Sequence, residues 1–393
     1  MTVGTRKWSL SSCELSRAAV NEPGHNQGEK VQMELSQSGG MDRRTFLVRS
    51  GSAVAGIGLL SIGGGVLEGC SNSSTPSTTT TTTPKMTKLS LQESYINNAE
   101  FAGFYCAAKK GYFAKYGLDV DVVSAGATTD PRQVVANGGA LTGVVSETSD
   151  MIIGVSQGVP YKCFGASFQQ NPGCLMVLAN SGIYNIKDLE GKIIGMQDNA
   201  RQQVIGILGS NGVPLDKVTM QVVGDDPTPL VEHKIDAYTA YVFNEPIALS
   251  MQGIKTRCYS FSDIGLPGYG DCLIALNSTL SSQPDLLARF TRASQEGWAY
   301  ALANPSEAVT ITLKDYPSGQ NTKQQQLQMT AQIPMLTNAL TKKNGLMWID
   351  KGVMQAAINA AKAASSLKAG SNVTLADVMT QEILIRAKTV SPV

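Results

Sequence analysis

Two hydrophobic periods organise the chain after residue 87. Short apolar runs, several of them alternating with polar residues at a period of two, predict β-strands. Longer stretches, in which apolar residues recur every three to four positions, lie between these runs and predict helices. The expected strands are 89–94, 118–123, 141–145, 161–167, 174–179, 192–196 and 218–223.

The expected helices change in character along the chain. Early helices at 101–110, after Met151 and at 201–211 separate the strands, whereas later helices at 285–304, 321–340 and 351–366 follow one another. Strands that alternate with helices indicate βα units and mostly parallel sheets. We therefore expect an α/β fold with two lobes that share a cleft, because ligands of open α/β sheets bind outside the carboxyl ends of the strands.

The first 70 residues carry signals for export. Residues 1–40 show no sustained period, and we expect a non-native or disordered extension. In 41–70, Arg43 and Arg44 precede an apolar run and the sequence Leu-Glu-Gly-Cys. This order resembles a twin-arginine lipoprotein signal that ends at Cys70, the expected site of lipidation. The alternative is a buried helical hairpin with an incidental cysteine. If the signal is correct, translation is expected to start at Met41.

Residues 71–87 consist almost entirely of Ser, Thr, Pro and Asn. Such a segment has little apolar surface to bury, so it cannot offset the entropy lost on ordering. We expect a flexible linker between the lipid anchor and the folded part.

The composition excludes several classes of function. The 393 residues are 42% hydrophobic, and the formal net charge is +1. This balance argues against nucleic-acid binding, which needs a basic face. The two histidines and seven scattered cysteines show no metal-ligand or Ser/His/Asp pattern. We therefore expect no metal, no cofactor and no enzymatic activity; one histidine, His233, is expected to be exposed.

Four segments in order resemble the solute-binding proteins of the thiamine-pyrimidine and riboflavin type. This NMT1/THI5-like family lies within a wider group that binds sulfonates, taurine and nitrate. The resemblance implies a two-lobed fold of the periplasmic-binding-protein type (type II), with residues 88–180 in lobe 1, 181–268 in lobe 2, and 269–393 returning to lobe 1 before the C-terminal helices. The segments are 95–120, 182–195, 218–230 and 234–249.

The first of these segments suggests one wall of a ligand site. Tyr95 follows a strand and is expected to stack on a flat ring, where the family often has Trp. Asn98 and Glu100 are expected to make polar contacts, although Asn98 alternatively caps the helix that follows. Ser146 and Thr148 are candidates in the Ser-Glu-Thr-Ser loop, and their alternative is also helix capping.

The last segment suggests the opposite wall. The resemblance assigns ring recognition to Glu245, which stands between Asn244 and Pro246 after an apolar strand. The alternative for this residue is a solvated glutamate at a helix start. Tyr241 and Asn244 are companions of Glu245. Gln169 and Gln170 are further candidates, because they follow a strand.

The resemblance implies an extracytoplasmic, lipid-anchored monomer that serves an ABC permease and its ATPase. The expected ligand is a small heteroaromatic nutrient, either a thiamine pyrimidine precursor or a riboflavin-like molecule. A sulfonate, taurine or nitrate importer is the alternative; Arg132 and Arg201 remain open as anion ligands. A pyrimidine-metabolising enzyme of the same fold and a tethered sensor are further alternatives.

Overall fold

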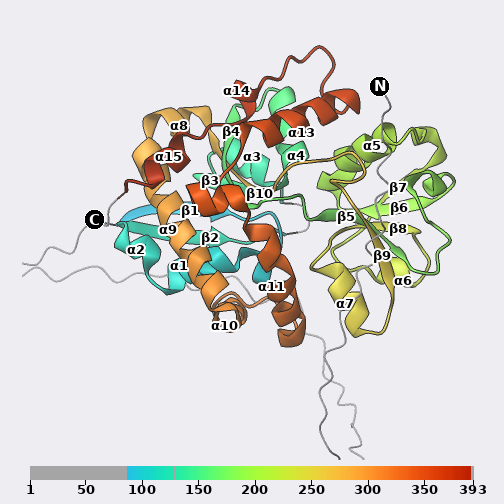
Figure 1. Ribbon diagram of the computed structural model, residues 1–393, viewed down its shortest axis with the longest axis horizontal. Helices are drawn as coiled ribbons and strands as arrows, with labels where there is room; N and C mark the ends of the chain where they lie inside the picture. The colour runs from blue at the N-terminus through green and yellow to red at the C-terminus, as the bar shows by residue number, and fades with distance from the viewer. Residues whose placement is uncertain (1–85, 127–128, 391–393) are drawn as a thin grey trace, which may run out of the picture. The chain divides into compact units, whose positions relative to one another are not determined.

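The computed structural model describes residues 86–126 and 129–390 (Figure 1). The expected extension, export signal, lipidation site and nearly all of the linker lie outside the described residues. The linker was expected to reach residue 87, but Thr87 already opens the first strand. No helix of the described residues combines the length and apolar character that a membrane span requires.

The first sheet has five strands in the order β2-β1-β3-β10-β4. β1 is parallel to β2 and β3, whereas β10 is antiparallel to β3 and β4. The strands are β1 (Thr87–Gln92), β2 (Leu118–Val123), β3 (Thr142–Glu147), β4 (Tyr161–Phe168) and β10 (Gly270–Leu276).

The second sheet also has five strands, in the order β7-β6-β8-β5-β9. β6 is parallel to β7 and β8, whereas β5 is antiparallel to β8 and β9. The strands are β5 (Gly173–Leu178), β6 (Ile193–Met196), β7 (Thr219–Val222), β8 (Ala237–Tyr241) and β9 (Thr256–Ser260).

The sheets are mixed, not mostly parallel as expected. The chain leaves the first sheet after β4 and enters the second with β5, and it returns between β9 and β10. Gly173 at the start of β5 is opposite Tyr241 at the end of β8, and Gly270 at the start of β10 is opposite Glu147 at the end of β3. β5 and β10, the strands that follow the two crossings between the sheets, therefore start at the edge where neighbouring strands end and run antiparallel to them. β5 also belongs to the second sheet, so the expected boundary near residue 180 comes too late.

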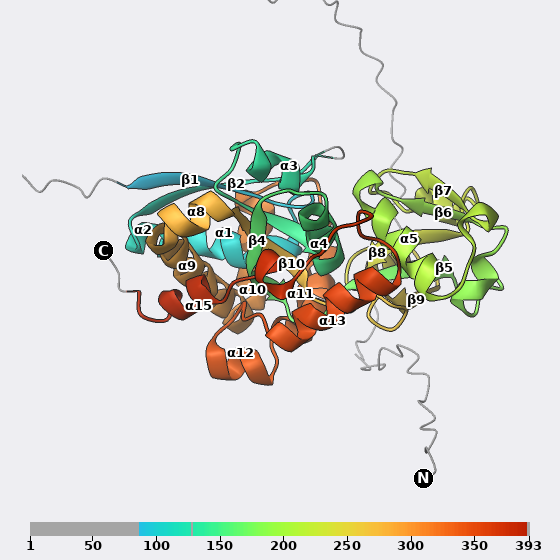
Figure 2. The ribbon, with the colours of Figure 1, turned by 90° about the horizontal axis from the view of Figure 1, so that it is seen from above.

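Helices cover both sheets. The helices after β10 form a continuous series in which α9 packs on α1, and α13 contacts α4 of the first lobe and α5 of the second (Figures 1 and 2). The helix expected at 321–340 is divided, because Asn338 caps a new one. The α-helices are α1 (Ala102–Lys109), α2 (Tyr112–Lys115), α3 (Pro131–Ala136), α4 (Thr148–Ser156), α5 (Arg201–Ser210), α6 (Thr228–Val231), α7 (Glu245–Met251), α8 (Asn277–Ser282), α9 (Pro284–Ala303), α10 (Pro305–Asp315), α11 (Thr322–Leu336), α12 (Ala339–Asn344), α13 (Lys351–Ala363), α14 (Leu375–Val378) and α15 (Glu382–Ala387). The 3₁₀ helices are η1 (Ala99–Phe101), η2 (Ile186–Leu189), η3 (Asp198–Ala200) and η4 (Leu215–Lys217).

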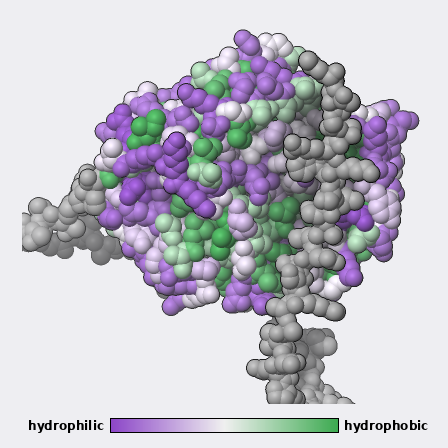
Figure 3. All heavy atoms as spheres, in the orientation of Figure 1, coloured by the Kyte–Doolittle hydropathy of each residue, from purple (hydrophilic) through white to green (hydrophobic). Residues whose placement is uncertain are grey.

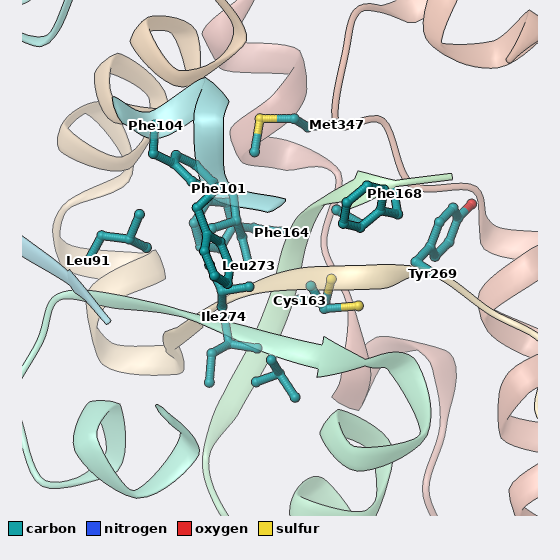
Figure 4. Close-up of a cluster of buried hydrophobic side chains, with 14 of the residues drawn as sticks. Leu91, Phe101, Phe104, Cys163, Phe164, Phe168, Tyr269, Leu273, Ile274 and Met347 are labelled. Carbon is teal, nitrogen blue, oxygen red and sulfur yellow. The ribbon is translucent and has the colours of Figure 1, made fainter. Parts of the chain in front are cut away.

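The larger core lies between the first sheet and the helical series. Aromatic and aliphatic side chains from η1, α1, β4 and β10 meet there (Figure 4). Gly297 of α9 makes the contact with α1 possible, since a Cβ there would lie 2.2 Å from the carbonyl oxygen of Gly103. Burying each large apolar side chain is worth about 1.5–3 kcal/mol. This core holds η1 and the ends of β1, β3 and β10 in place.

The second sheet has a separate core on each face. Leu175 and Val177 of β5 pack toward α5, whereas Cys174 and Met176 pack on the other side with residues of α6 and α7. This alternation follows the two-residue period of a strand. The face in Figure 3 is largely hydrophilic at its periphery, with a hydrophobic area at its lower centre.

Candidate functional site

A cleft lies where the carboxyl ends of strands from the two sheets meet. It encloses about 550 Å³ of space between atoms, its open mouth included. Its lining comes from both sheets and consists of Ser94, Tyr95, Glu100, Ser146, Glu147, Gln197, Ala200, Gln203, Thr239, Ala240, Tyr241, Asn244, Glu245 and Phe261.

Glu245 provides a carboxyl group on the wall of the cleft that belongs to the second sheet. It is the first residue of α7 and is 6% exposed, so it is at a helix start but is not solvated. Its Oε2 accepts a hydrogen bond from the backbone N–H of Tyr241 at 2.9 Å, and its Oε1 accepts one from Asn244 Nδ2 at 3.1 Å. Burial raises the pKa of Glu245 to about 7, against the opposing effect of the Tyr241 N–H. Near neutral pH it can therefore serve as a hydrogen-bond acceptor for a ligand.

Tyr95 is on the opposite wall, three residues after β1. Its hydroxyl lies 3.5 Å from Glu245 Oε1 and 3.5 Å from the carbonyl oxygen of Asp225. The structure thus brings Tyr95 and Glu245 together across one cleft. An aromatic face and a carboxylate are thereby presented to the same space.

Two further predicted residues in the lining, Tyr241 and Asn244, make contacts with the first lobe, and a third, Glu100, lines the first sheet's wall. Tyr241 at the end of β8 donates from its hydroxyl to the carbonyl oxygen of Ser146 on β3, at 2.6 Å. Asn244 accepts at Oδ1 from Gln324 of α11, at 3.3 Å. Glu100, in η1, is 2% exposed and faces the cleft. Burial raises the pKa of Glu100 to about 8.

Asn98 and Thr148 were predicted to bind ligand but lie outside the lining. Asn98 is fully buried and caps η1, since its Oδ1 accepts from the N–H of Glu100 at 2.7 Å. Thr148 bonds to the second crossover, the segment between β9 and β10. Its Oγ1 accepts a hydrogen bond from the N–H of Tyr269 at 2.8 Å and donates one to the carbonyl oxygen of Tyr269 at 3.1 Å. The Oδ1 of Asn98 and the hydroxyl of Thr148 are therefore bonded within the protein.

Gln169 and Gln170 are also outside the lining. Gln169 binds structural partners, because its N–H donates to the carbonyl of Met335 at 2.7 Å and its Oε1 accepts from Asn338 at 3.3 Å. Gln170 is exposed. Both lie on the first crossover, where the chain turns toward the second sheet before it reaches the cleft.

Several lining residues were not predicted. Gln197 directly follows β6, and its side chain donates to Tyr238 Oη and accepts from Thr239 Oγ1, both at 2.8 Å. The rule that ligand contacts follow strand ends, applied to β6, would have found it. Gln203 of α5 contacts Asp150 of α4. No sequence signal points to this contact, because it joins two lobes.

The two crossovers are joined by Asn171. Its Nδ2 donates to Glu147 Oε2 and to the carbonyl oxygen of Leu266, each at 3.0 Å, and its Oδ1 accepts from the N–H of Gly173 at 2.8 Å. One side chain therefore links the end of β3, the first crossover and the second. Such a position suits a hinge, where a few residues at element ends absorb the movement.

Charge in the cleft is one-sided. The described residues of the lining include Glu100, Glu147 and Glu245 and no Lys, Arg or His. Arg132 lies nearby, but its guanidinium is bound to both carboxyl oxygens of Asp130, at 2.9–3.2 Å, and to the carbonyl of Asp150 at 3.1 Å. Within the described residues no cluster of three His, Cys, Asp or Glu side chains has the arrangement of a metal site. His233 is exposed, as expected.

Known proteins resemble this chain in sequence and in fold. The riboflavin-binding protein RibY of Chloroflexus aurantiacus is 31% identical over 278 residues, which cover 68% of this chain and 78% of that protein. The formylaminopyrimidine-binding protein of Halalkalibacterium halodurans is 28% identical over 221 residues, or 55% and 67% of the two chains.

The fold matches that of solved binding proteins. The periplasmic aliphatic sulphonate binding protein SsuA of Escherichia coli superposes with a TM-score of 0.55 at 14% identity, over 75% of this chain and 92% of that one. The two-lobed, type II periplasmic-binding-protein fold is thereby confirmed. The sequence profile described as "NMT1/THI5 like" matches residues 98–308, more than half of the chain. The chain therefore belongs to the NMT1/THI5-like family.

Proposed function

We propose that the protein is the extracytoplasmic substrate-binding component of an ABC importer. It captures a small heteroaromatic nutrient, a riboflavin-like molecule or a thiamine pyrimidine precursor, when its cleft closes. The observation that carries this proposal is the meeting of Tyr95 and Glu245, 3.5 Å apart, in a cleft lined by both sheets. The names of RibY and of the formylaminopyrimidine-binding protein support the same ligand class.

The two residues divide the recognition of a flat ring. Tyr95 offers its face for stacking, which is worth about 0.5–1.5 kcal/mol beyond the buried area. Glu245 accepts hydrogen bonds from N–H groups at the ring edge, and a bond to an ionised group is worth about 1.5–3 kcal/mol. An imide N–H of a flavin and an amino group of a pyrimidine both meet this requirement.

The side chains that line the cleft favour this class over anions. A sulfonate or nitrate needs cationic or multiple N–H partners, whereas the described lining carries three carboxyl groups and no cationic side chain. Arg132 is bound to Asp130, and Arg201 at the start of α5 is outside the lining. The resemblance to SsuA extends to the fold alone.

Contacts between the lobes indicate how capture is completed. Tyr241 bonds to Ser146, and Gln203 bonds to Asp150, so polar groups of the two lobes bond to each other in this arrangement. A ligand shifts an open–closed equilibrium only through contacts that are better in the closed state. A ring held between Tyr95 and Glu245 touches both lobes and meets that condition.

Thermal unfolding of the full-length chain tests the ligand class. We expect riboflavin or formylaminopyrimidine to raise the Tm, since a ligand that binds only the folded state stabilises it. Taurine and nitrate are the matched comparison. A rise with taurine or nitrate and none with either heterocycle would overturn the proposal. Native mass spectrometry of the protein as purified would identify a ligand that is retained.

Two alternatives make different predictions. An enzyme of this fold would convert formylaminopyrimidine to a product, whereas a binding protein releases it unchanged. A tethered sensor would bind the same ligand without import. Uptake of radiolabelled riboflavin by cells with and without the gene separates transport from sensing.

We further propose that the mature protein is a lipid-anchored monomer at the outer face of the cell membrane and that it delivers ligand to a permease and its ATPase. The twin arginine and the sequence ending at Cys70 support export and lipidation. Cells fed radiolabelled palmitate should label the wild-type protein but not the Cys70→Ser variant. Equal labelling of the two would contradict the anchor.

A further inference from the structure

Asp271 is a buried acid at the cleft edge of the first sheet. It is the second residue of β10, is fully buried, and neither of its carboxyl oxygens accepts a hydrogen bond from an N–H or hydroxyl group among the described residues. Its φ of 49° is in the left-handed region, which residues other than glycine rarely adopt. A buried, unsatisfied group on a strained backbone is maintained by its surroundings and often marks a functional site.

Glu100 lies between Asp271 and the cleft. Its carboxyl group lines the cleft and comes within hydrogen-bond distance of the carboxyl group of Asp271. Two ionised carboxyl groups repel each other at this range, and neither has a hydrogen to donate. The contact is therefore a hydrogen bond only if at least one of the two groups is protonated.

The side chain of Asn98 lowers the pKa of Glu100, but the titratable groups around the pair carry no positive charge. Glu93 follows β1, Glu245 lies across the cleft, and Cys272 is the next residue of β10; the phenols of Tyr95, Tyr105 and Tyr241 complete the surroundings. Among these groups none is cationic. Burial is the main cause that raises the pKa of Glu100 to about 8 and the pKa of Asp271 well above its usual range. Glu100 thus holds its proton near neutral pH, and the raised pKa of Asp271 favours its protonated form as well.

We infer that protonated Asp271 donates a hydrogen bond to Glu100 and that Glu100, which is itself protonated, donates a hydrogen bond to an acceptor atom of the bound ring. This inference rests on the proposed function and narrows its ligand class. The first sheet then recognises an acceptor on the ring while Glu245 of the second sheet recognises a donor. A suitable ring edge carries an N–H beside a carbonyl oxygen or an unprotonated ring nitrogen.

Ser94 adds a second unsatisfied group to the same wall. Its side chain is 7% exposed and lines the cleft, and its Oγ has no hydrogen-bond partner among the described residues. A buried hydroxyl without a partner is destabilising, and a ligand that bonds to it removes this penalty. The first sheet's wall therefore has polar groups that a bound ligand can satisfy.

Titration of the full-length chain with riboflavin, from about pH 6 to about pH 9, tests the donation. Wild-type Kd should rise about tenfold per pH unit once Glu100 ionises above its pKa of about 8. The Glu100→Gln variant keeps an N–H donor that cannot ionise, so its Kd should lack this alkaline rise. Glu190→Gln, at an exposed glutamate, is the matched control and should keep it. Free riboflavin titrated in parallel corrects for ionisation of the probe.

Unfolding in urea at the same pH values tests, without a ligand, whether Glu100 is protonated in the folded protein. Because the pKa of Glu100 is raised in the folded protein, that protein holds a proton that the unfolded chain releases, and stability should fall as the pH rises toward about 8. The fall should be smaller for Glu100→Gln than for Glu190→Gln. Equal falls would show that Glu100 is not protonated in the folded protein and would overturn the inference.

The outcomes separate the inference from the proposed function. If riboflavin binds with the same alkaline rise in the wild type and in Glu100→Gln, or with no rise in either, the donation is wrong and the binding function stands. If neither riboflavin nor formylaminopyrimidine binds the wild type, the proposed function fails, and the donation to a ring fails with it. The unfolding measurement then still decides whether Glu100 and Asp271 hold the protons.

Discussion

The hydroxyl of Tyr241 in the second lobe donates a 2.6 Å hydrogen bond to the carbonyl oxygen of Ser146 in the first. Both residues line the cleft, and the bond exists only when the two lobes meet. The closed arrangement therefore has a direct polar link beside the site that we assign to the ligand. It provides a way to change closure without removing a group assigned to ring recognition.

Replacing Tyr241 with Phe should weaken riboflavin binding roughly fivefold, because one hydrogen bond contributes about 1 kcal/mol net. Isothermal titration measures the change. Tyr259→Phe is the control, since it removes a 2.8 Å hydroxyl bond to Ile183 that lies within the second lobe. Equal affinity losses in the two variants would show that the bond between the lobes has no special role.

Glu245→Gln should weaken binding by roughly tenfold to a hundredfold, because an ionised acceptor is lost. The wild type should bind more tightly as the pH rises through about 7, where Glu245 becomes a carboxylate. Binding of the variant should lack this acid limb. Because affinity should also fall when Glu100 ionises above about pH 8, wild-type affinity should be greatest between about pH 7 and about pH 8. An affinity that falls through about pH 7 would contradict the role of Glu245.

Tyr95→Leu should weaken binding more than Tyr95→Phe does. Leucine loses the stacking face, a loss of roughly two- to twelvefold, whereas phenylalanine keeps the face and loses only a long 3.5 Å hydroxyl contact. Titration with riboflavin compares the three proteins. If leucine binds as well as phenylalanine does, the ring is not stacked on residue 95.

Gly270→Ala should destabilise the fold by about 1–3 kcal/mol, because the added methyl group overpacks the crossover. A Cβ at this position would lie 2.4 Å from Pro172 Cδ, where the two crossovers pass each other. Gly224→Ala is the matched control, since a Cβ there meets nothing within 4 Å. Urea unfolding measures both variants, and equal stabilities would contradict close packing at the crossover.

Much of the fold follows from local patterns. The expected strand at 118–123 has the observed bounds, and others, such as 161–167 and 192–196, differ by about one residue at an end. The strands β9 and β10 were not expected, and the direction of β5 was not predictable in this way. It depends on where the chain crosses between sheets, and a run such as Gly270–Leu276 carries no signal for its neighbours.

The candidate site shows the same division. Tyr95 and Glu245 could be selected from the sequence because each follows a strand of its sheet, and strand ends meet at a cleft. Asn98 and Gln169 have the same local pattern, but partners distant in the sequence bond to them: Asn98 Oδ1 accepts from Gln328 of α11, and Gln169 Oε1 accepts from Asn338. Asp271 could not be recognised as the partner of Glu100, since only the return of β10 brings them together.

A crystal structure of the full-length chain grown with riboflavin would show directly where the ring binds. We expect the ring to stack on Tyr95, with an N–H at its edge within hydrogen-bond distance of Glu245 and an acceptor facing Glu100. Density for riboflavin outside this cleft, or a ring in the cleft that touches neither Tyr95 nor Glu245, would contradict the assignment of these two residues to ligand capture.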